Sequence, residues 1–467
     1  MCSFVLLNSA TVSKKTNNYR PTNKIQNGDP MSNTATLLII ALFFTAPVLA
    51  HVNVESLDER ERQIVQHIDQ QLPQSIKLLK QAVDINSGTM NFAGVKQVGM
   101  LFKAEFDGLG MDTQWLEGQE FGRAGHLQAT YLSANPDAAK ILLIGHLDTV
   151  FAKDDPFQKH ALLDGQEIAG PGITDMKGGD VIIIAALRAL QELALLENLS
   201  IKVVMTGDEE ASGRPLALSK KALIDAAQWA DIALGFEDGD GNINTAVTSR
   251  RGSVNWALSV AGRPAHSSQI FSDEVGDGAI FEAGRILNEF RVELKDEALL
   301  SFNPGRIAGG TRVTADADSS SMNAFGKTNV VAKELMVKGG IRAASPEQLE
   351  RAKQRMGHIV GQNLRHTSAV LSFDEGYPPM AQTPANTKLL ALYNQVSLDL
   401  GYNSITAVNP RNAGAADISF AASHVDQALD GLGLMGRGGH TKEEVADMSS
   451  FGKNTHKTAI LLYRLSK

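Results

Sequence analysis

The chain has 467 residues, of which 43% are hydrophobic and 21% are charged, as in a folded globular protein. Its formal net charge of −8 argues against nucleic-acid binding, because a surface that neutralises phosphates needs an excess of lysine and arginine. The only cysteine is Cys2, so the body of the fold has no disulfide, no thiolate metal site and no cysteine nucleophile.

Residues 1–50 are expected to be a leader and signal peptide. Met31–Ala50 contains the apolar run Leu37–Phe44 and ends in VLA, a pattern typical of secretory cleavage sites. The run is too short to predict a membrane-spanning helix. Either Met1 or Met31 is the start, since the basic residues stand upstream of Met31. The mature chain is therefore expected to be exported, periplasmic or secreted, without a membrane anchor; a disordered tail is the alternative.

From about residue 60 the chain alternates helical and strand patterns. Apolar residues recur at helical spacing over 64–72 and 76–83, and Pro73 is expected to break or restart that helix. Short apolar runs predict buried strands on either side of a buried helix, over 141–144, 201–205 and 232–234 with the helix at 180–196. This order predicts an α/β fold with a mixed, largely parallel sheet and helices on both faces.

The middle of the chain predicts a smaller, inserted α+β domain. Strand patterns over 254–260 and 329–338 alternate with helical stretches over 278–294 and 346–364, which suits a sheet with one open face. A final helix is expected over 452–465. The expected organisation is a catalytic domain in two parts, 51–250 and 373–467, interrupted by a smaller domain over 251–372.

Five short segments concentrate carboxylate and imidazole side chains. The first, GHLDTV, follows the first strand and places His146 and Asp148 two residues apart, on the same side of an extended chain. A metal-bound imidazole usually donates its second N–H to a carboxylate, and Asp148 is placed to accept it. The second, GITDMKGG, carries Asp175, whose two oxygens can bridge two cations.

The remaining segments supply further candidate ligands. TGDEEASG contains Glu209 and Glu210, adjacent carboxylates that are costly to hold in a cleft without compensating cations or protons. One would bind metal while the other takes a proton from water. GFEDG offers Glu237 or Asp238, and GGHTKEE offers His440.

Each segment alone has an ordinary structural explanation, such as a buried histidine, a solvated helix start, a glycine turn or a surface loop. Three of them, however, follow the carboxyl ends of expected strands, where open α/β sheets place their sites. Their joint order along the chain favours a metal site.

The set resembles the co-catalytic zinc hydrolases that include glutamate carboxypeptidase, aminoacylase, acetylornithine deacetylase and succinyl-diaminopimelate desuccinylase, from about residue 75 to 465. The resemblance implies two zinc ions per subunit, a homodimer, and a peptide or N-acyl amino acid as substrate. It also implies these metal ligands: His146 and Glu237 for one zinc, Glu210 and His440 for the other, and Asp175 between them. Asp148 would orient His146, and Glu209 would be the general base.

The inserted domain resembles the lid and dimerisation domain of the same family. By that resemblance, His266 in RPAHSS reaches the partner's active site and helps hold the oxyanion. Asn329 in GKTNVV matches an asparagine motif, and Arg342 in GIR would meet a substrate carboxylate. A buried sheet histidine, a capping asparagine and a surface arginine are the structural alternatives.

The expected activity is therefore cleavage of an amide bond next to a carboxylate-bearing amino acid, as in a glutamate carboxypeptidase. Three residues depart from the family pattern: Ala332 replaces a proline, Gly340 an acidic residue, and Tyr377 an arginine common in glutamate-specific relatives. A deacylase or dipeptidase on the same scaffold is one alternative. A binding protein with a metal-filled cleft is another, although pure binding needs no general base.

Overall fold

The computed structural model describes residues 56–315 and 321–467. The expected signal peptide over residues 1–50 lies outside them. Within the described ranges, no helix combines the length and the apolar character needed to cross a bilayer.

A six-stranded sheet forms the centre of the larger body, in the order β1-β2-β6-β3-β7-β16. The four strands β6, β3, β7 and β16 run parallel to one another, whereas β1 and β2 at the opposite edge pair antiparallel. The strands are β1 (Asp112–Glu117), β2 (Gly125–Tyr131), β3 (Ala139–His146), β6 (Leu199–Thr206), β7 (Ile232–Gly235) and β16 (Gln427–Leu429). The expectation of a mixed, largely parallel sheet is confirmed.

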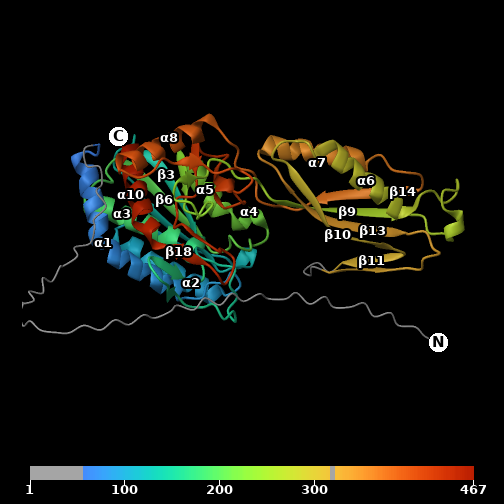
Figure 1. Cartoon of the computed structure of the whole chain (residues 1–467), viewed down its shortest axis with the longest axis horizontal. Coiled ribbons are helices and arrows are strands. Elements are labelled where there is room, and N and C mark those ends of the chain that lie inside the picture. Colours follow the sequence, from blue (N-terminus) through green and yellow to red (C-terminus); the bar gives the residue numbers. More distant parts are fainter. Residues whose placement is uncertain (1–55, 316–320) are drawn as a thin grey trace, which may run out of the picture. The chain divides into compact units, whose positions relative to one another are not determined.

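Helices cover both faces of this sheet. Successive side chains of β3 point to opposite faces, so they pack in two different hydrophobic clusters. Ile141 and Leu143 belong to the hydrophobic cluster that includes the helices α1, α3 and α10, while Leu142 and Ile144 pack with α5 and α9 (Figure 1). These helices are α1 (Glu59–Val83), α3 (Gly178–Glu192), α5 (Lys221–Trp229), α9 (Ile418–Ala421) and α10 (Met448–Leu465).

The expectation that Pro73 breaks the first helix is wrong. Helix α1 runs through Pro73 without interruption. Pro73 lies on the exposed face, so its ring meets solvent, while Ile64 and Ile68 before it and Leu79 after it are buried in one cluster. Burial of the apolar face on both sides of the proline offsets the lost backbone hydrogen bond.

A second hydrophobic cluster belongs to residues between Val254 and Phe373. It packs an antiparallel four-stranded sheet, in the order β10-β13-β9-β14, against two helices (Figure 1). The elements are β9 (Val254–Gly262), α6 (Gly278–Leu294), β10 (Ser301–Gly310), β13 (Glu334–Arg342), α7 (Pro346–Val360) and β14 (Thr367–Phe373). Strand β9 alternates buried with exposed residues, as expected for a sheet with one open face.

The chain leaves the larger body and returns to it at one paired point. The backbone N–H groups of Ser253 and Tyr377 each donate to the other's carbonyl, at 2.9 and 3.0 Å. The remaining elements are α2 (Phe92–Gly108), α4 (Leu216–Ser219), α8 (Pro384–Asp399), the hairpin β11 (Arg312–Ala315) with β12 (Met322–Phe325), β8 (Thr245–Ala246) with β15 (Thr406–Ala407), and the sheet of β4 (Ala161–Leu162), β5 (Glu167–Ala169), β17 (Gly436–Arg437) and β18 (Val445–Asp447), together with short turns at Gln119–Phe121, Ile173–Lys177 and Ser267–Gln269.

Candidate metal centre

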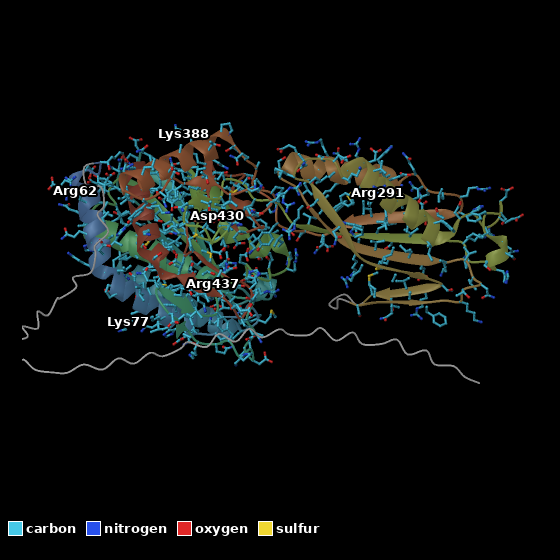
Figure 2. The ribbon with its side chains drawn as sticks, in the orientation of Figure 1. Arg62, Lys77, Arg291, Lys388, Asp430 and Arg437 are labelled. Carbon is cyan, nitrogen blue, oxygen red and sulfur yellow. The ribbon has the colours of Figure 1, made fainter. Side chains whose placement is uncertain are left out.

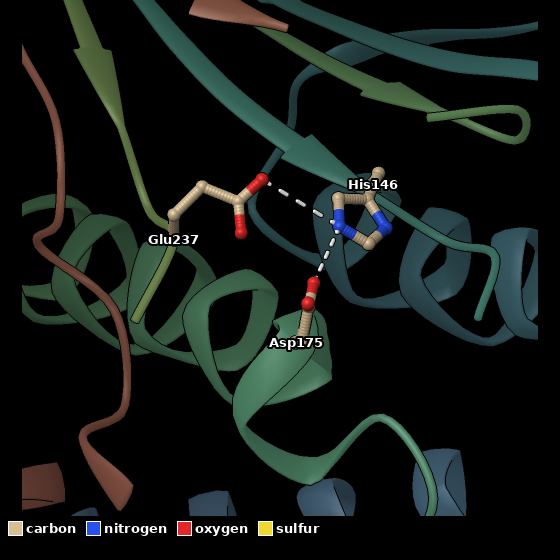
Figure 3. A group of neighbouring side chains, drawn as sticks. All are labelled: His146, Asp175 and Glu237. Atoms are coloured by element: carbon tan, nitrogen blue, oxygen red, sulfur yellow. Dashed lines mark hydrogen bonds and ion pairs between the residues drawn. The ribbon is translucent and has the colours of Figure 1, made fainter. Parts of the chain in front are cut away.

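The first group of candidate ligands lies at the carboxyl ends of two neighbouring strands. His146 ends β3, and its Nε2 lies 3.0 Å from Asp175 Oδ1 and 3.6 Å from Glu237 Oε1 (Figure 3). Glu237 follows β7, and Asp175 lies in the turn before α3. Of the two carboxylates that the sequence left open, Glu237 therefore faces the imidazole, and Asp238 belongs to neither of the ligand groups found in the described ranges.

The second group shares Asp175 with the first. His440 Nε2 lies 2.9 Å from Asp175 Oδ2 and 3.2 Å from Glu210 Oε2. In each group of three, the candidate ligand atoms all lie within 4.8 Å of one another. The two oxygens of Asp175 thus face different histidines, which is the arrangement of a carboxylate that bridges two cations.

Asp148 organises both the histidine and the loop with the two glutamates. The Nδ1 of His146 lies closer to the Asp148 carbonyl oxygen, at 3.1 Å, than to its carboxylate Oδ1, at 3.6 Å. The buried carboxylate instead accepts from the backbone N–H groups of Glu209 (3.0 Å) and Glu210 (3.2 Å) and from Thr89 Oγ1 (2.6 Å). The backbone of Asp148 orients the imidazole, and its side chain orients the two glutamates.

Glu444 holds the turn that carries Asp175. Its fully buried carboxylate accepts from the backbone N–H groups of Gly172 and Thr174, both at 2.9 Å, and of Asp175 at 3.3 Å. The contact joins the His440 loop near the end of the chain to a turn some 270 residues earlier. The two segments that meet at the shared carboxylate are therefore anchored to each other.

Burial and the neighbouring charges shift the pKa values of the candidate ligands. Burial opposes the charged imidazole of His146, but the carboxylates of Glu237 and Asp175 raise its pKa well above the usual value. Hydrogen bonds to Asp175 and Glu210 raise the pKa of His440 to about 11. Excess negative charge around two imidazoles is the electrostatic environment that divalent cations require.

The candidate base Glu209 lies in the same field. Burial raises the pKa of Glu209 well above its usual value, and the charges of Asp417 and Glu210 add to this, whereas His146 opposes it. Asp430, labelled in Figure 2, is also buried near the site, where it accepts from Arg250 Nε at 2.7 Å and from the Glu237 backbone N–H at 3.4 Å.

The three expected substrate-binding residues lie on the smaller body and are exposed. His266 Nδ1 lies 2.9 Å from Ser268 Oγ, and the Asn329 carbonyl accepts from the Ser267 backbone N–H at 2.9 Å. Arg342 ends β13. Among the described residues, no hydrogen bond or ion pair joins these three to the seven residues of the candidate metal centre.

Several residues around the site carry no sequence signal of their own. Glu444 is the second of two glutamates that follow His440 closely, and only its burial distinguishes it. Thr89 lies in a loop 59 residues before Asp148 in the sequence, although its hydroxyl donates to the Asp148 carboxylate.

The donor set fits a pair of divalent metal ions. Imidazole and carboxylate ligands suit zinc, and the two three-residue groups with one shared carboxylate match the ligand count of a two-metal hydrolase site. The buried backbone contacts of Asp148 and Glu444 supply the outer support that metal ligands usually have.

Comparisons with known proteins agree with this geometry. Carboxypeptidase G2 from Pseudomonas sp. (strain RS-16) is 24% identical over 450 residues, covering 92% of this chain and 97% of the relative. The succinyl-diaminopimelate desuccinylase of Magnetococcus marinus is 27% identical over 365 residues, covering 73% of this chain and 88% of the relative.

Among solved structures, a dinuclear metal-binding peptidase of the M20 family from Bacillus subtilis superposes with a TM-score of 0.59 at 13% identity. The match covers 84% of this chain and 97% of the other. The model of peptidase family M20/M25/M40 matches residues 142–463, a segment that contains all seven residues of the candidate metal centre. The chain therefore belongs to peptidase family M20/M25/M40, a family of metallopeptidases and amidohydrolases.

Proposed function

We propose that the protein is a zinc-dependent hydrolase that cleaves an amide bond next to a carboxylate-bearing amino acid, in the manner of a carboxypeptidase. The observation that carries the proposal is the pair of ligand groups that share Asp175, with Glu209 beside them. The similarity to carboxypeptidase G2 over nearly the whole chain supports the same conclusion.

Two zinc ions would be held by His146 with Glu237 and by His440 with Glu210, with Asp175 between them. When bound, such a pair supplies Lewis acidity and lowers the pKa of water toward neutrality. Glu209 would accept the proton of the attacking water and return it to the leaving amine.

The substrate carboxylate is assigned to Arg342, which is exposed at the end of β13. Guanidinium groups bind carboxylates through paired hydrogen bonds. His266, from the second subunit of a homodimer, would stabilise the oxyanion. Asn329 is assigned to substrate contact in the same domain.

The test is an assay of the zinc-loaded mature chain, from His51 onward, with three groups of substrates: N-acyl glutamates, N-acetyl amino acids and free dipeptides. We expect turnover of N-acyl amino acids with a C-terminal carboxylate. Glu209→Gln should retain zinc and lose at least about 10³-fold in kcat, because the proton acceptor is removed while the ligands remain. No turnover with any group, despite bound metal, would contradict the proposal.

A deacylase or dipeptidase on this scaffold is the second candidate. Tyr377, where glutamate-specific relatives carry an arginine, and the similarity to a desuccinylase favour it. The same assay distinguishes the candidates, because a deacylase would prefer N-acetyl amino acids, and a dipeptidase free dipeptides, to N-acyl glutamates.

We further propose that the protein is exported after cleavage at Ala50 and acts as a homodimer. The apolar run before Ala50 supports export. Ile280, Phe281 and Val292 of α6 are each at least half exposed, which supports an interface on the smaller body. N-terminal sequencing of protein from the culture should read from His51, and light scattering of the purified chain should give twice the mass of the monomer.

A further inference from the structure

The hydroxyl of Tyr377 contacts the loop that carries Glu209, the candidate base. It donates to the backbone carbonyl of Glu209 at 2.9 Å and lies 3.2 Å from Asp417 Oδ1. Ser212 Oγ lies 3.0 Å from the same hydroxyl. One side chain thus contacts the loop on both sides of Glu210.

Asp417, which lies beside the Tyr377 hydroxyl, belongs to a buried network of ion pairs. Lys220 is fully buried and its Nζ lies 3.0 Å from Asp208 Oδ1 and 2.9 Å from Asp417 Oδ1. Asp417 Oδ2 accepts from Thr206 Oγ1 at 2.5 Å. Because Asp417 contacts the buried Lys220 ammonium through one oxygen and accepts from Thr206 through the other, its carboxylate holds a fixed position opposite Tyr377.

The Tyr377 ring is held independently of its hydroxyl. It packs edge-to-face against Phe420 with ring centroids 4.8 Å apart, and the Lys220 ammonium lies 5.6 Å from its centroid. Its backbone pairs in both directions with Ser253 at the crossing between the two bodies. The hydroxyl can therefore be removed without removing what places the ring.

We propose that Tyr377 is a positioning residue for Glu209: its single hydroxyl proton is donated to the Glu209 carbonyl, and its ring is held in place by Phe420 and by the backbone pairing with Ser253. The inference rests on the proposed function for the role of Glu209, but this hydroxyl-to-carbonyl tether itself does not. Burial and the charge of Asp417 keep the pKa of the Tyr377 hydroxyl above its usual value, so the hydroxyl remains a donor at neutral pH. In this chain the position of the family's arginine thus serves the base.

The test compares Tyr377→Phe with Tyr402→Phe in the zinc-loaded full-length enzyme. Tyr402 is a control for removal of a tyrosine hydroxyl, because its hydroxyl lies 2.8 Å from His456 Nδ1, away from the loop. We expect Tyr377→Phe to lower kcat roughly tenfold with KM and zinc content unchanged, as the loss of one hydrogen bond allows. The control should keep the wild-type kcat.

A second measurement does not depend on turnover. Hydrogen exchange of peptides covering residues 207–213 should be faster in Tyr377→Phe than in the wild type or in Tyr402→Phe, while the melting temperatures of the two variants stay similar. Unchanged exchange in this segment would overturn the tether. Faster exchange with unchanged kcat in an active enzyme would overturn the positioning role, as would equal kcat losses in both variants. An inactive wild type with faster exchange in the variant would refute the proposed function and leave the tether standing.

Discussion

The two halves of the metal centre use the same ligand types but are built differently. The His146 side chain is 0% exposed and sits at the end of a central strand, with its second nitrogen fixed by a backbone carbonyl. The His440 side chain is 58% exposed and lies in a glycine-rich loop, with a backbone φ of +63°. The sheet therefore fixes one half, whereas the other depends on how a loop is held.

This difference predicts an order of metal affinity. A ligand set that is already in place loses little conformational freedom on binding, while a loop must be ordered at that moment. The His146 group should bind its metal more tightly than the His440 group. Glu444 reduces this difference in metal affinity, because it holds the His440 loop against the turn of Asp175.

The largest expected effect removes the residue on which both halves depend. Asp175→Ala takes one ligand from each group, so we expect less than about one equivalent of zinc and a loss of activity of at least about 10³-fold. Metal analysis after dialysis together with an activity assay would measure it. Two retained equivalents would mean that Asp175 is not shared between the sites.

Removal of one histidine at a time tests the comparison itself. His146→Ala leaves Asp175 and Glu237 without their buried imidazole partner, so we expect loss of metal at that site and a destabilisation of about 3 kcal/mol in the metal-free protein.

In His440→Ala the lost contacts are partly exposed, so about one zinc equivalent should remain and stability should change by less than about 1 kcal/mol. Zinc titration and denaturant unfolding of both variants give the comparison. Equal effects of the two substitutions would show that the halves do not differ.

A smaller effect is expected from substitution of Glu444, which belongs to neither group of candidate metal ligands found in the described residues. Glu444→Gln keeps one acceptor oxygen for the backbone N–H groups of the Asp175 turn, while Glu444→Ala leaves them unpaired. We expect zinc affinity to fall by roughly 10- to 100-fold in the alanine variant and less in the glutamine variant. If both variants bound zinc as the wild type does, Glu444 would not anchor the turn.

A further prediction concerns protons. The pKa values of His146 and His440 are raised in the metal-free protein, that of His440 to about 11, so both imidazoles are protonated at neutral pH. Burial also raises the pKa of the ligand Glu237. Metal binding must remove these protons, so zinc affinity should rise with pH between about 6 and 8 as protons are released. Calorimetry in buffers of different ionisation enthalpy counts them, and a pH-independent affinity would contradict the expected protonation.

Much of the fold was predictable because apolar runs record burial directly. The runs at 141–144 and 201–205 lie inside β3 and β6, and the helix expected over 278–294 is α6 with the same bounds. Strand β13 begins later than expected, at Glu334, because residues 327–330 form a turn and Val330 and Val331 then pair with the His266 segment. The strands β1 and β2, less apolar and antiparallel, were not predicted.

The candidate site also contains residues that could be predicted from the sequence and residues that could not. The five segments could be named because imidazole and carboxylate groups beside glycine turns are the usual ligands of metal sites, and the roles of the seven residues followed from their resemblance to a known family. Glu444, Thr89 and Tyr377 act through contacts with segments distant in the chain, at 270, 59 and 168 residues, and no local pattern contains such contacts. Their roles follow only from the folded arrangement.

The anchoring of the Asp175 turn by Glu444 has a consequence for biosynthesis. The turn is synthesised early, but its carboxylate support and its second imidazole arrive only with the last thirty or so residues, after the whole inserted domain. A polypeptide that stops before residue 440 lacks both the second imidazole and the carboxylate that accepts from the backbone of the Asp175 turn. We therefore expect the second ligand group to form only after the last residues have been synthesised.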